Sequence, residues 1–467
     1  MNPTQLGICD IRAQLRAGTL TSVALAKALI ERTNERTAMR GYVAFDEETL
    51  LKEATEADQR IAAGTDLPLL GVPIALKDNI DSTDYPCSAG TGSLLGSLPV
   101  MDADVVTRLR AAGALIAGKA NMHELAFGIT TDNHATGEAL NPWDTDRIPG
   151  GSSGGSGVVV AAGMVPASIG TDTGGSVRVP ASLCGLVGFR PTAGRVSGRG
   201  IAPISTTRDT AGPIARSVAD CALLDAVLTT SQAPLLTVSL AGARLGVPAN
   251  HFWDDLDPGV RSVTEAALDR LRAAGAQLVP VALPSVAELN AAAGFPIALH
   301  EFVRDMQDYL AYAKRGISFE ELVAGVKSPD VKEIVSPLLS GGTIPEAVYE
   351  QALGSRRQLQ EVYADAFLHS GVHALVFPTV PVPAAKTSEK MSVVLNGKPE
   401  PLFPTFIRNT DPGSNAGLPG LTLPAGLSGG LPVGLALDGL PGSDRLILSL
   451  GQAMEPLFPM NSAPWMR

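Results

Sequence analysis

The N-terminal part of the chain carries apolar residues at the spacing of amphipathic helices. In residues 22–36 the apolar positions recur every three or four residues. Thr21 and Ser22, at the start of this segment, are good N-cap residues. Residues 47–63 form a second, more highly charged helical segment. The start of the chain is therefore predicted to be helical.

The next segments alternate between short apolar runs and helical patterns. Residues 70–76 and 115–118 are nearly continuous apolar runs, which predict buried strands. Between them, residues 103–112 have a helical pattern closed by Gly113. Such alternation predicts α/β layering around a mostly parallel or mixed sheet.

The same alternation returns later in the chain. A helix is predicted over 258–274 and a strand over 277–281, and further strands are predicted over 372–380 and 431–437. Between them, residues 285–369 are mainly helical and charged, which indicates a peripheral insertion that covers the sheet.

The Gly- and Pro-rich stretch 412–432 is interleaved with apolar residues and is interpreted as an ordered loop. No internal repeat interrupts the chain. We therefore expect one domain over residues 1–467 that contains the helical insertion.

Composition narrows the class of protein. The 467 residues are 45% hydrophobic and have a net charge of −11, which argues against nucleic acid or an anionic membrane as a partner. The N-terminus lacks a signal peptide pattern, and no apolar run reaches the ~18 residues of a membrane helix. The four widely spaced cysteines form no CxxC pair, so reduced thiols and a cytoplasmic location are expected: Cys9, Cys87, Cys184 and Cys221.

Candidate chemistry is concentrated in two glycine-rich loops. The segment GGSSGGSG holds Ser152, and GTDTGGSVRVP holds Ser176 twenty-four residues later. Glycine leaves backbone N–H groups uncovered, so a serine in such a loop has donors beside it for an oxyanion. This pattern is typical of acyl-transfer enzymes, which need a nucleophile and an oxyanion hole.

Lys77 ends the apolar run in GVPIALKDN, seventy-five residues before Ser152. Burial of its ammonium group would lower the lysine pKa, by up to ~3–5 units when burial is complete. Neutral near pH 7, such a lysine can act as a general base. A lysine at the surface end of a strand is the commoner arrangement.

Together these elements resemble the amidase signature family of serine hydrolases. The resemblance extends through CGLVGFRPT (184–192) and LPGLTLPA (418–425) and covers roughly residues 23–450. It implies an α/β/α sandwich around a large mixed β-sheet and hydrolysis without a metal or an organic cofactor. The strings NMHELAFGIT, GTDTGGSVRVPASLCGLVGFRPT and RNTDPGSNAGLPGLTLPA are most similar to the branch that cleaves indoleacetamide and mandelamide.

The resemblance also implies roles for individual residues. Ser176 is the expected nucleophile, Ser152 the bridging serine with a cis peptide bond, and Lys77 the base and later the acid. The N–H groups of Thr173, Gly174 and Gly175 are expected to form the oxyanion hole. The resemblance also gives Phe127 and Ile129 a role in the substrate pocket. Residue chemistry, apart from the resemblance, favours structural roles for Ser153, Asp172, Arg178, His123 and Cys184.

Several alternatives stay open from the sequence. GGSSG also matches the GxSxG nucleophile elbow, which would make Ser152 the nucleophile and require a histidine such as His369 or His373. A tRNA-dependent amidotransferase subunit would need partner subunits, whereas the expected partner here is a small amide, with a homodimer left open. Esters, anilides and carbamates are further candidate substrates. A phosphate cradle is disfavoured because GK[ST] and GxGxxG are absent from the serine block.

Overall fold

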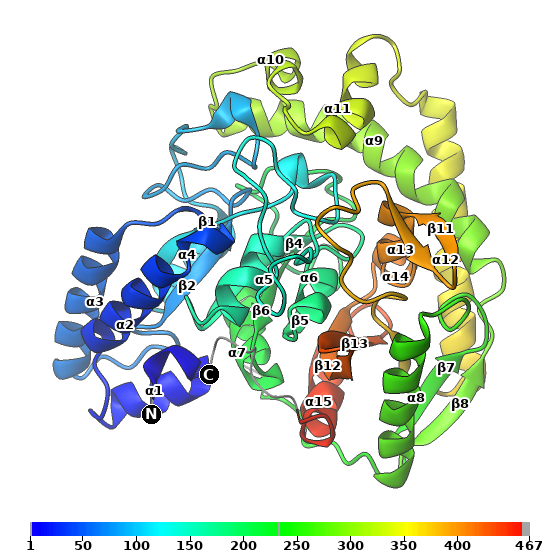
Figure 1. Cartoon of the computed structure of the whole chain (residues 1–467), viewed down its shortest axis with the longest axis horizontal. Helices are drawn as coiled ribbons and strands as arrows, with labels where there is room; N and C mark the ends of the chain where they lie inside the picture. Colours follow the sequence, from blue (N-terminus) through cyan, green and yellow to red (C-terminus); the bar gives the residue numbers. More distant parts are fainter. Residues whose placement is uncertain (1, 232–233, 460–467) are drawn as a thin grey trace.

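A large mixed β-sheet organises the molecule. The computed structural model describes residues 2–231 and 234–459 (Figure 1). Within these described residues, the sheet has eleven strands in the order β1-β3-β2-β4-β6-β5-β12-β13-β9-β7-β8. Their bounds are β1 (Tyr42–Ala44), β2 (Pro73–Lys77), β3 (Leu115–Ala120), β4 (Ala167–Asp172), β5 (Val187–Arg190), β6 (Thr210–Ala215), β7 (Arg244–Pro248), β8 (Gln277–Val281), β9 (Ala374–Pro378), β12 (Gly420–Ser428) and β13 (Leu431–Asp438).

The helices surround this sheet, and a small separate hairpin is formed by β10 (Ser392–Leu395) and β11 (Lys398–Pro401). The α-helices are α1 (Ile8–Arg16), α2 (Ser22–Glu35), α3 (Glu47–Ala62), α4 (Asp104–Ala111), α5 (Gly154–Ala161), α6 (Arg178–Leu183), α7 (Val218–Thr229), α8 (Pro258–Ala273), α9 (Val286–Tyr312), α10 (Phe319–Ala324), α11 (Pro329–Val335), α12 (Glu346–Ser370), α13 (Leu402–Ile407), α14 (Asp411–Ala416) and α15 (Asp444–Met454).

Both faces of the sheet are covered. All five residues of β2 are buried, and its side chains alternate between two hydrophobic clusters: Ile74 and Leu76 belong to one cluster, and Ala75 to the other. Such a continuous apolar run is typical of a strand covered on both sides. The first cluster contains residues of α4, α7, α8 and α15, whereas the second contains residues of α3, α5 and α6. The α/β/α sandwich implied by the sequence is confirmed.

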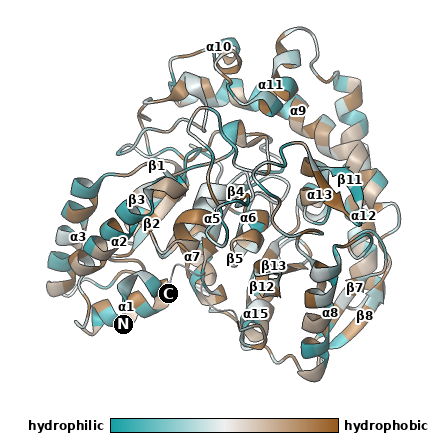
Figure 2. Ribbon diagram, viewed as in Figure 1, coloured by the Kyte–Doolittle hydropathy of each residue, from teal (hydrophilic) through white to brown (hydrophobic). Residues whose placement is uncertain are grey.

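Hydropathy follows the same layering (Figure 2). The central helix α5 is buried along its whole length and is coloured as hydrophobic, whereas the outer helix α3 shows both hydrophobic and hydrophilic bands. Within the described part of the chain, no helix is both long and apolar enough to cross a membrane.

The predicted elements are found with small shifts of their ends. The strand expected over 70–76 is β2, which begins at Pro73 because Leu70 and Gly71 lie in a turn. Residues 282–373, all of them described, hold helices and no strand, with α9 and α12 packed against each other at the outer edge of the molecule (Figure 1).

The prediction of an ordered loop over 412–432 is wrong. This stretch contains most of α14 and the nine-residue strand β12, which pairs with β5 on one side and β13 on the other. Pairing on both sides outweighs the low strand propensity of Gly and Pro, and the register shifts between Pro424 and Gly426, where the ladder is irregular.

Candidate active site

Lys77 lies at the carboxyl end of β2, beside the loop of residues 150–153 that holds Ser152 and is called the serine loop below. Its side chain is fully buried, and Nζ is 2.8 Å from both Ser152 Oγ and Thr171 Oγ1. Asn79 Nδ2 donates to the same threonine oxygen at 3.2 Å. The structure therefore brings together the lysine and the serine that the sequence placed seventy-five residues apart.

Burial sets the protonation state of this lysine. It lowers the pKa of Lys77 from 10.5 to about 7, because the ammonium form loses its hydration. The carboxylates of Asp209 and Asp172 oppose this effect by favouring the charged form. Lys77 therefore has a large neutral fraction near pH 7.

The serine loop is fixed by backbone contacts. The Gly151–Ser152 peptide bond is cis, and the Ser152 carbonyl accepts a hydrogen bond from His123 N–H at 3.0 Å. Ser153 N–H donates to the Ser176 carbonyl at 3.3 Å, and the Ser153 hydroxyl donates to the Thr171 carbonyl at 3.1 Å. Ser153 thus ties the serine loop to the loop that carries Ser176.

Ser176 sits in the turn between β4 and α6. Just before it, the fully buried Asp172 carboxylate accepts hydrogen bonds from Val177 N–H at 3.2 Å and from the guanidinium groups of Arg178 and Arg190. Burial alone would raise the pKa of Asp172, but the two arginines hold it well below its usual range. Asp172 is therefore an ionised brace at the centre of the turn, and Arg178 is part of that brace.

One predicted oxyanion donor is already engaged. Gly175 N–H donates to the Asp172 carboxylate at 2.8 Å, so this group points into the brace. Gly175 also has φ +135°, and a Cβ at this position would lie 2.1 Å from Thr410 Oγ1. The glycine is thus required by the tight approach of Thr410, and its N–H is not free in this structure.

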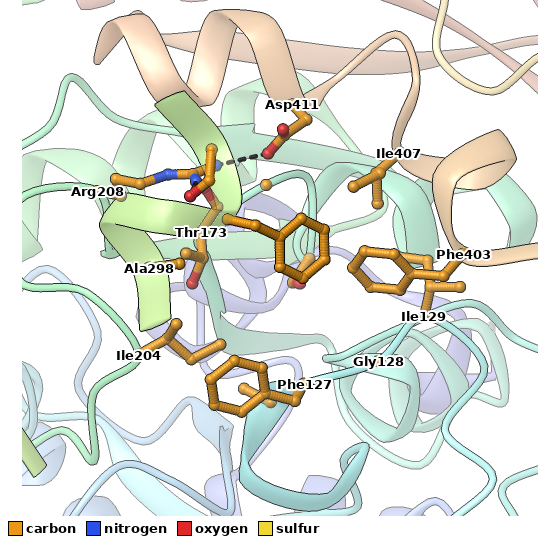
Figure 3. Close-up of a pocket in the computed structure, with 15 residues that line it drawn as sticks. Phe127, Gly128, Ile129, Thr173, Ile204, Arg208, Ala298, Phe403, Ile407 and Asp411 are labelled. Atoms are coloured by element: carbon orange, nitrogen blue, oxygen red, sulfur yellow. Dashed lines mark hydrogen bonds and ion pairs between the residues drawn. The ribbon is translucent and has the colours of Figure 1, made fainter. Parts of the chain in front are cut away.

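Ser176 opens into a cavity with mostly apolar walls (Figure 3). Thr173 and Gly174 line the cavity beside it, as do both residues expected from the NMHELAFGIT segment, Phe127 and Ile129. The remaining apolar lining comes from Ala126, Ile204, Phe295, Ala298, Phe403 and Ile407. Segments far apart in the sequence therefore meet around the serine.

Helix α9 supplies part of this cavity. Gly294, Phe295 and Ala298 lie on it, and the ring of Phe295 is 5.9 Å from that of Phe403 on α13. Phe127 packs edge-on against Phe302, also on α9, at 4.7 Å. The segment interpreted as a peripheral insertion thus contributes residues to the cavity wall.

A polar pair interrupts the apolar wall. Arg208 Nη2 donates to Asp411 Oδ1 at 2.5 Å, and Asn290 Nδ2 donates to Asp411 Oδ2 at 2.8 Å. Figure 3 shows Arg208 and Asp411 on the side of the cavity opposite Phe127. Sequence reasoning did not identify this pair, because 203 positions separate the arginine from the aspartate. Asp411 lies in the string RNTDPGSNAGLPGLTLPA, but nothing in that string marks the aspartate as a partner of Arg208.

The histidines required by the nucleophile-elbow alternative lie elsewhere. His369 and His373 are exposed, and their Nδ1 atoms contact the Asp365 carbonyl and Arg244 N–H. The buried Ser152 has Lys77 as its side-chain partner instead. His123 is buried, with Nε2 2.9 Å from Asp330 Oδ2, which matches a structural histidine.

Cys184 is buried, and burial raises the pKa of its thiol. This is the environment expected for a core thiol. Across residues 2–231 and 234–459, no cluster of three or more His, Cys, Asp or Glu side chains is arranged to hold a metal ion.

Comparison with known proteins identifies the family. A model of the family described as Amidase matches residues 24–448. An indoleacetamide hydrolase of Agrobacterium vitis is 42% identical over 453 residues, with 97% of each chain covered. A mandelamide hydrolase of Pseudomonas putida is 41% identical over 478 residues, with 98% of this chain and 93% of the relative covered.

The fold gives the same result. The crystal structure of the native peptide amidase from Stenotrophomonas maltophilia superposes with a TM-score of 0.87 at 30% identity, and 99% of each chain is covered. On these grounds the chain belongs to the amidase family and is an enzyme that hydrolyses amides.

Proposed function

We propose that this amidase hydrolyses primary amides of arylacetic-type acids to the acid and ammonia. The observation that carries the proposal is a mostly apolar cavity, lined by aromatic rings, that contains Ser176. The Ser176 carbonyl accepts a hydrogen bond from Ser153 N–H, and Ser153 directly follows the Ser152 that contacts the buried Lys77. An aromatic acyl group would bury its ring against Phe127 and Phe403, where apolar contact is favourable. The indoleacetamide and mandelamide hydrolases among the relatives support this substrate class.

The proposed chemistry is a proton relay. Neutral Lys77 takes the proton of Ser152 Oγ while Ser152 Oγ takes the proton of Ser176 Oγ, which forms a bond to the amide carbon. The C–N bond then breaks as the proton returns along the same relay to the nitrogen, and ammonia leaves. Water attacks the resulting ester, passes its proton to the relay, and releases the acid together with free Ser176.

Charge develops on the carbonyl oxygen during both attacks. Thr173 and Gly174 line the cavity next to Ser176, and we assign their N–H groups to the oxyanion. We leave Gly175 out of this set, because its N–H is committed to Asp172. The brace around Asp172 would keep these donors in position before the substrate binds.

The test is ammonia release from indole-3-acetamide, phenylacetamide and mandelamide by the wild-type enzyme, Ser176→Ala and Lys77→Ala. We expect release by the wild type and near-abolition in both variants. Activity retained in Ser176→Ala would mean that the nucleophile is another residue. Hydrolysis confined to anilides, esters or carbamates would replace the proposed substrate class while keeping the relay.

A further inference from the structure

The Asp411 carboxylate, which pairs with Arg208 in the cavity wall, can accept more hydrogen bonds than it receives from the described residues. Asp411 lies at the start of α14, with 12% of its side chain exposed, and it lines the cavity. A carboxylate can accept about four hydrogen bonds. Within the described part of the chain, Arg208 donates to one oxygen and Asn290 to the other. Each oxygen therefore keeps a lone pair for a further donor.

Two glycines leave this carboxylate uncovered. A Cβ added at Gly174 would lie 2.6 Å from Asp411 Oδ1, and one added at Gly294 would lie 3.4 Å from Oδ2. Both glycines line the cavity, and Gly174 is two residues before Ser176. The carboxylate is thus close to the place where the amide carbonyl must sit for attack by Ser176.

This position selects the part of the substrate that can reach it. A group beside the carbonyl is attached to the α-carbon, whereas the function proposed above puts the aromatic ring against the apolar wall around Phe127 and Phe403. Figure 3 shows Phe127 on the side of the cavity away from Asp411. The charge of Arg208 offsets that of Asp411, so the site offers an acceptor with little net negative charge. A neutral donor fits such a site better than an ammonium group.

We propose that Asp411 is a specificity-determining residue that accepts a hydrogen bond from a hydroxyl group on the α-carbon of the acyl part. The preferred substrates are therefore α-hydroxy arylacetamides. This inference rests on the proposed function, because it assumes an amide whose carbonyl lies at Ser176. In this proposal, the hydrogen bonds from Arg208 and Asn290 hold the Asp411 carboxylate in place.

Matched substrates test the inference. Mandelamide and phenylacetamide differ only by the α-hydroxyl group, and a hydrogen bond to a charged acceptor corresponds to roughly 10-fold or more in kcat/KM. We expect the wild-type enzyme to prefer mandelamide by about that factor, with most of the difference in KM because the bond forms on binding. Asp411→Asn keeps the shape but lowers acceptor strength, so the ratio of kcat/KM for mandelamide to kcat/KM for phenylacetamide should fall to a few-fold.

Two further variants complete the design. Gly294→Ala places a methyl group over the carboxylate at ordinary contact distance in a helix, where alanine is favourable, so it should fold and also reduce the preference. Ile407→Val trims the cavity wall without touching the pair and should leave the ratio unchanged. If Asp411→Asn fails to fold, the mandelamide preference of Gly294→Ala still tests the role of Asp411.

The outcomes separate the two proposals. If the wild-type enzyme hydrolyses phenylacetamide but Asp411→Asn and Gly294→Ala keep its mandelamide preference, the role of Asp411 is wrong and the proposed function stands. A stronger preference for protonated 2-phenylglycinamide than for mandelamide would overturn the neutral-donor assignment. If neither primary amide is hydrolysed, the proposed function and this inference both fail.

Discussion

Titration of Lys77 should appear directly in the pH dependence of the reaction. The fall of its pKa from 10.5 to about 7, at 1.36 kcal/mol per unit, corresponds to about 5 kcal/mol against the charged form. An ordinary lysine is neutral in about one molecule in 3,000 at pH 7, whereas Lys77 is neutral in roughly half. Because the base must be neutral, kcat/KM for phenylacetamide should rise with an apparent pKa of about 7 and level off above it.

The assay is ammonia release at low substrate concentration from pH 5 to pH 10. Lys77→Met serves as the comparison, because methionine has a similar length and no basic nitrogen. We expect it to lose ~10²–10⁴-fold in kcat/KM and to lack the rise near pH 7. A wild-type rate that keeps rising to pH 10, or a flat profile, would refute the argument from burial.

Stability supplies an independent check with a definite sign. The folded-state pKa of Lys77 lies below the unfolded value, so the unfolded chain binds the extra proton between pH 7 and pH 10.5. The lysine therefore destabilises the fold fully below pH 7, and this cost fades as the pH rises to 10.5. Lys77→Met should therefore raise the free energy of unfolding more at pH 7 than at pH 10. The increase at pH 7 is at most ~5 kcal/mol, and the loss of the hydrogen bonds to Ser152 and Thr171 reduces it. An equal change in the free energy of unfolding at both pH values would contradict the lowered pKa of Lys77.

Three further substitutions test the surroundings of the site. Asp172→Asn removes the charge between two buried arginines and should lower the free energy of unfolding in urea by ~3–5 kcal/mol; an unchanged midpoint would count against the brace. Phe403→Ala should lower kcat/KM for phenylacetamide by about 5–10-fold through lost apolar contact, with acetamide as the unaffected control. Gly175→Ala forces a Cβ toward Thr410 at a positive φ, so thermal melting should show a loss of at least ~1–3 kcal/mol, and wild-type stability would show that the loop relaxes.

Much of the fold follows from local patterns in the sequence. The helices α2, α3 and α8 and the strands β2 and β8 lie where the pattern of apolar residues predicts them. The strand β12 could not be predicted in this way, because Gly420, Pro424 and Gly426 are poor strand residues. It forms because β5 and β13 pair with it, and the sequence pattern carries no local signal of that pairing.

The site divides in the same manner. Lys77, Ser152 and Ser176 lie in glycine-rich or strand-end motifs whose chemistry is local, so the sequence alone could propose them as site residues. Thr171 was within reach as well, since it lies in the same motif as Ser176 and contacts Lys77. Asp411 and Arg208 become neighbours only through the packing of α14 against the loop before β6, which no motif reveals.

The central claim is that Ser176 is the nucleophile, activated through Ser152 by Lys77. The most direct measurement is mass spectrometry of enzyme quenched in acid during turnover of phenylacetamide, followed by peptide mapping. The account predicts one phenylacetyl group on the peptide that contains Ser176, and no label in Ser176→Ala. A label on the peptide that contains Ser152, or one that persists in Ser176→Ala, would contradict it.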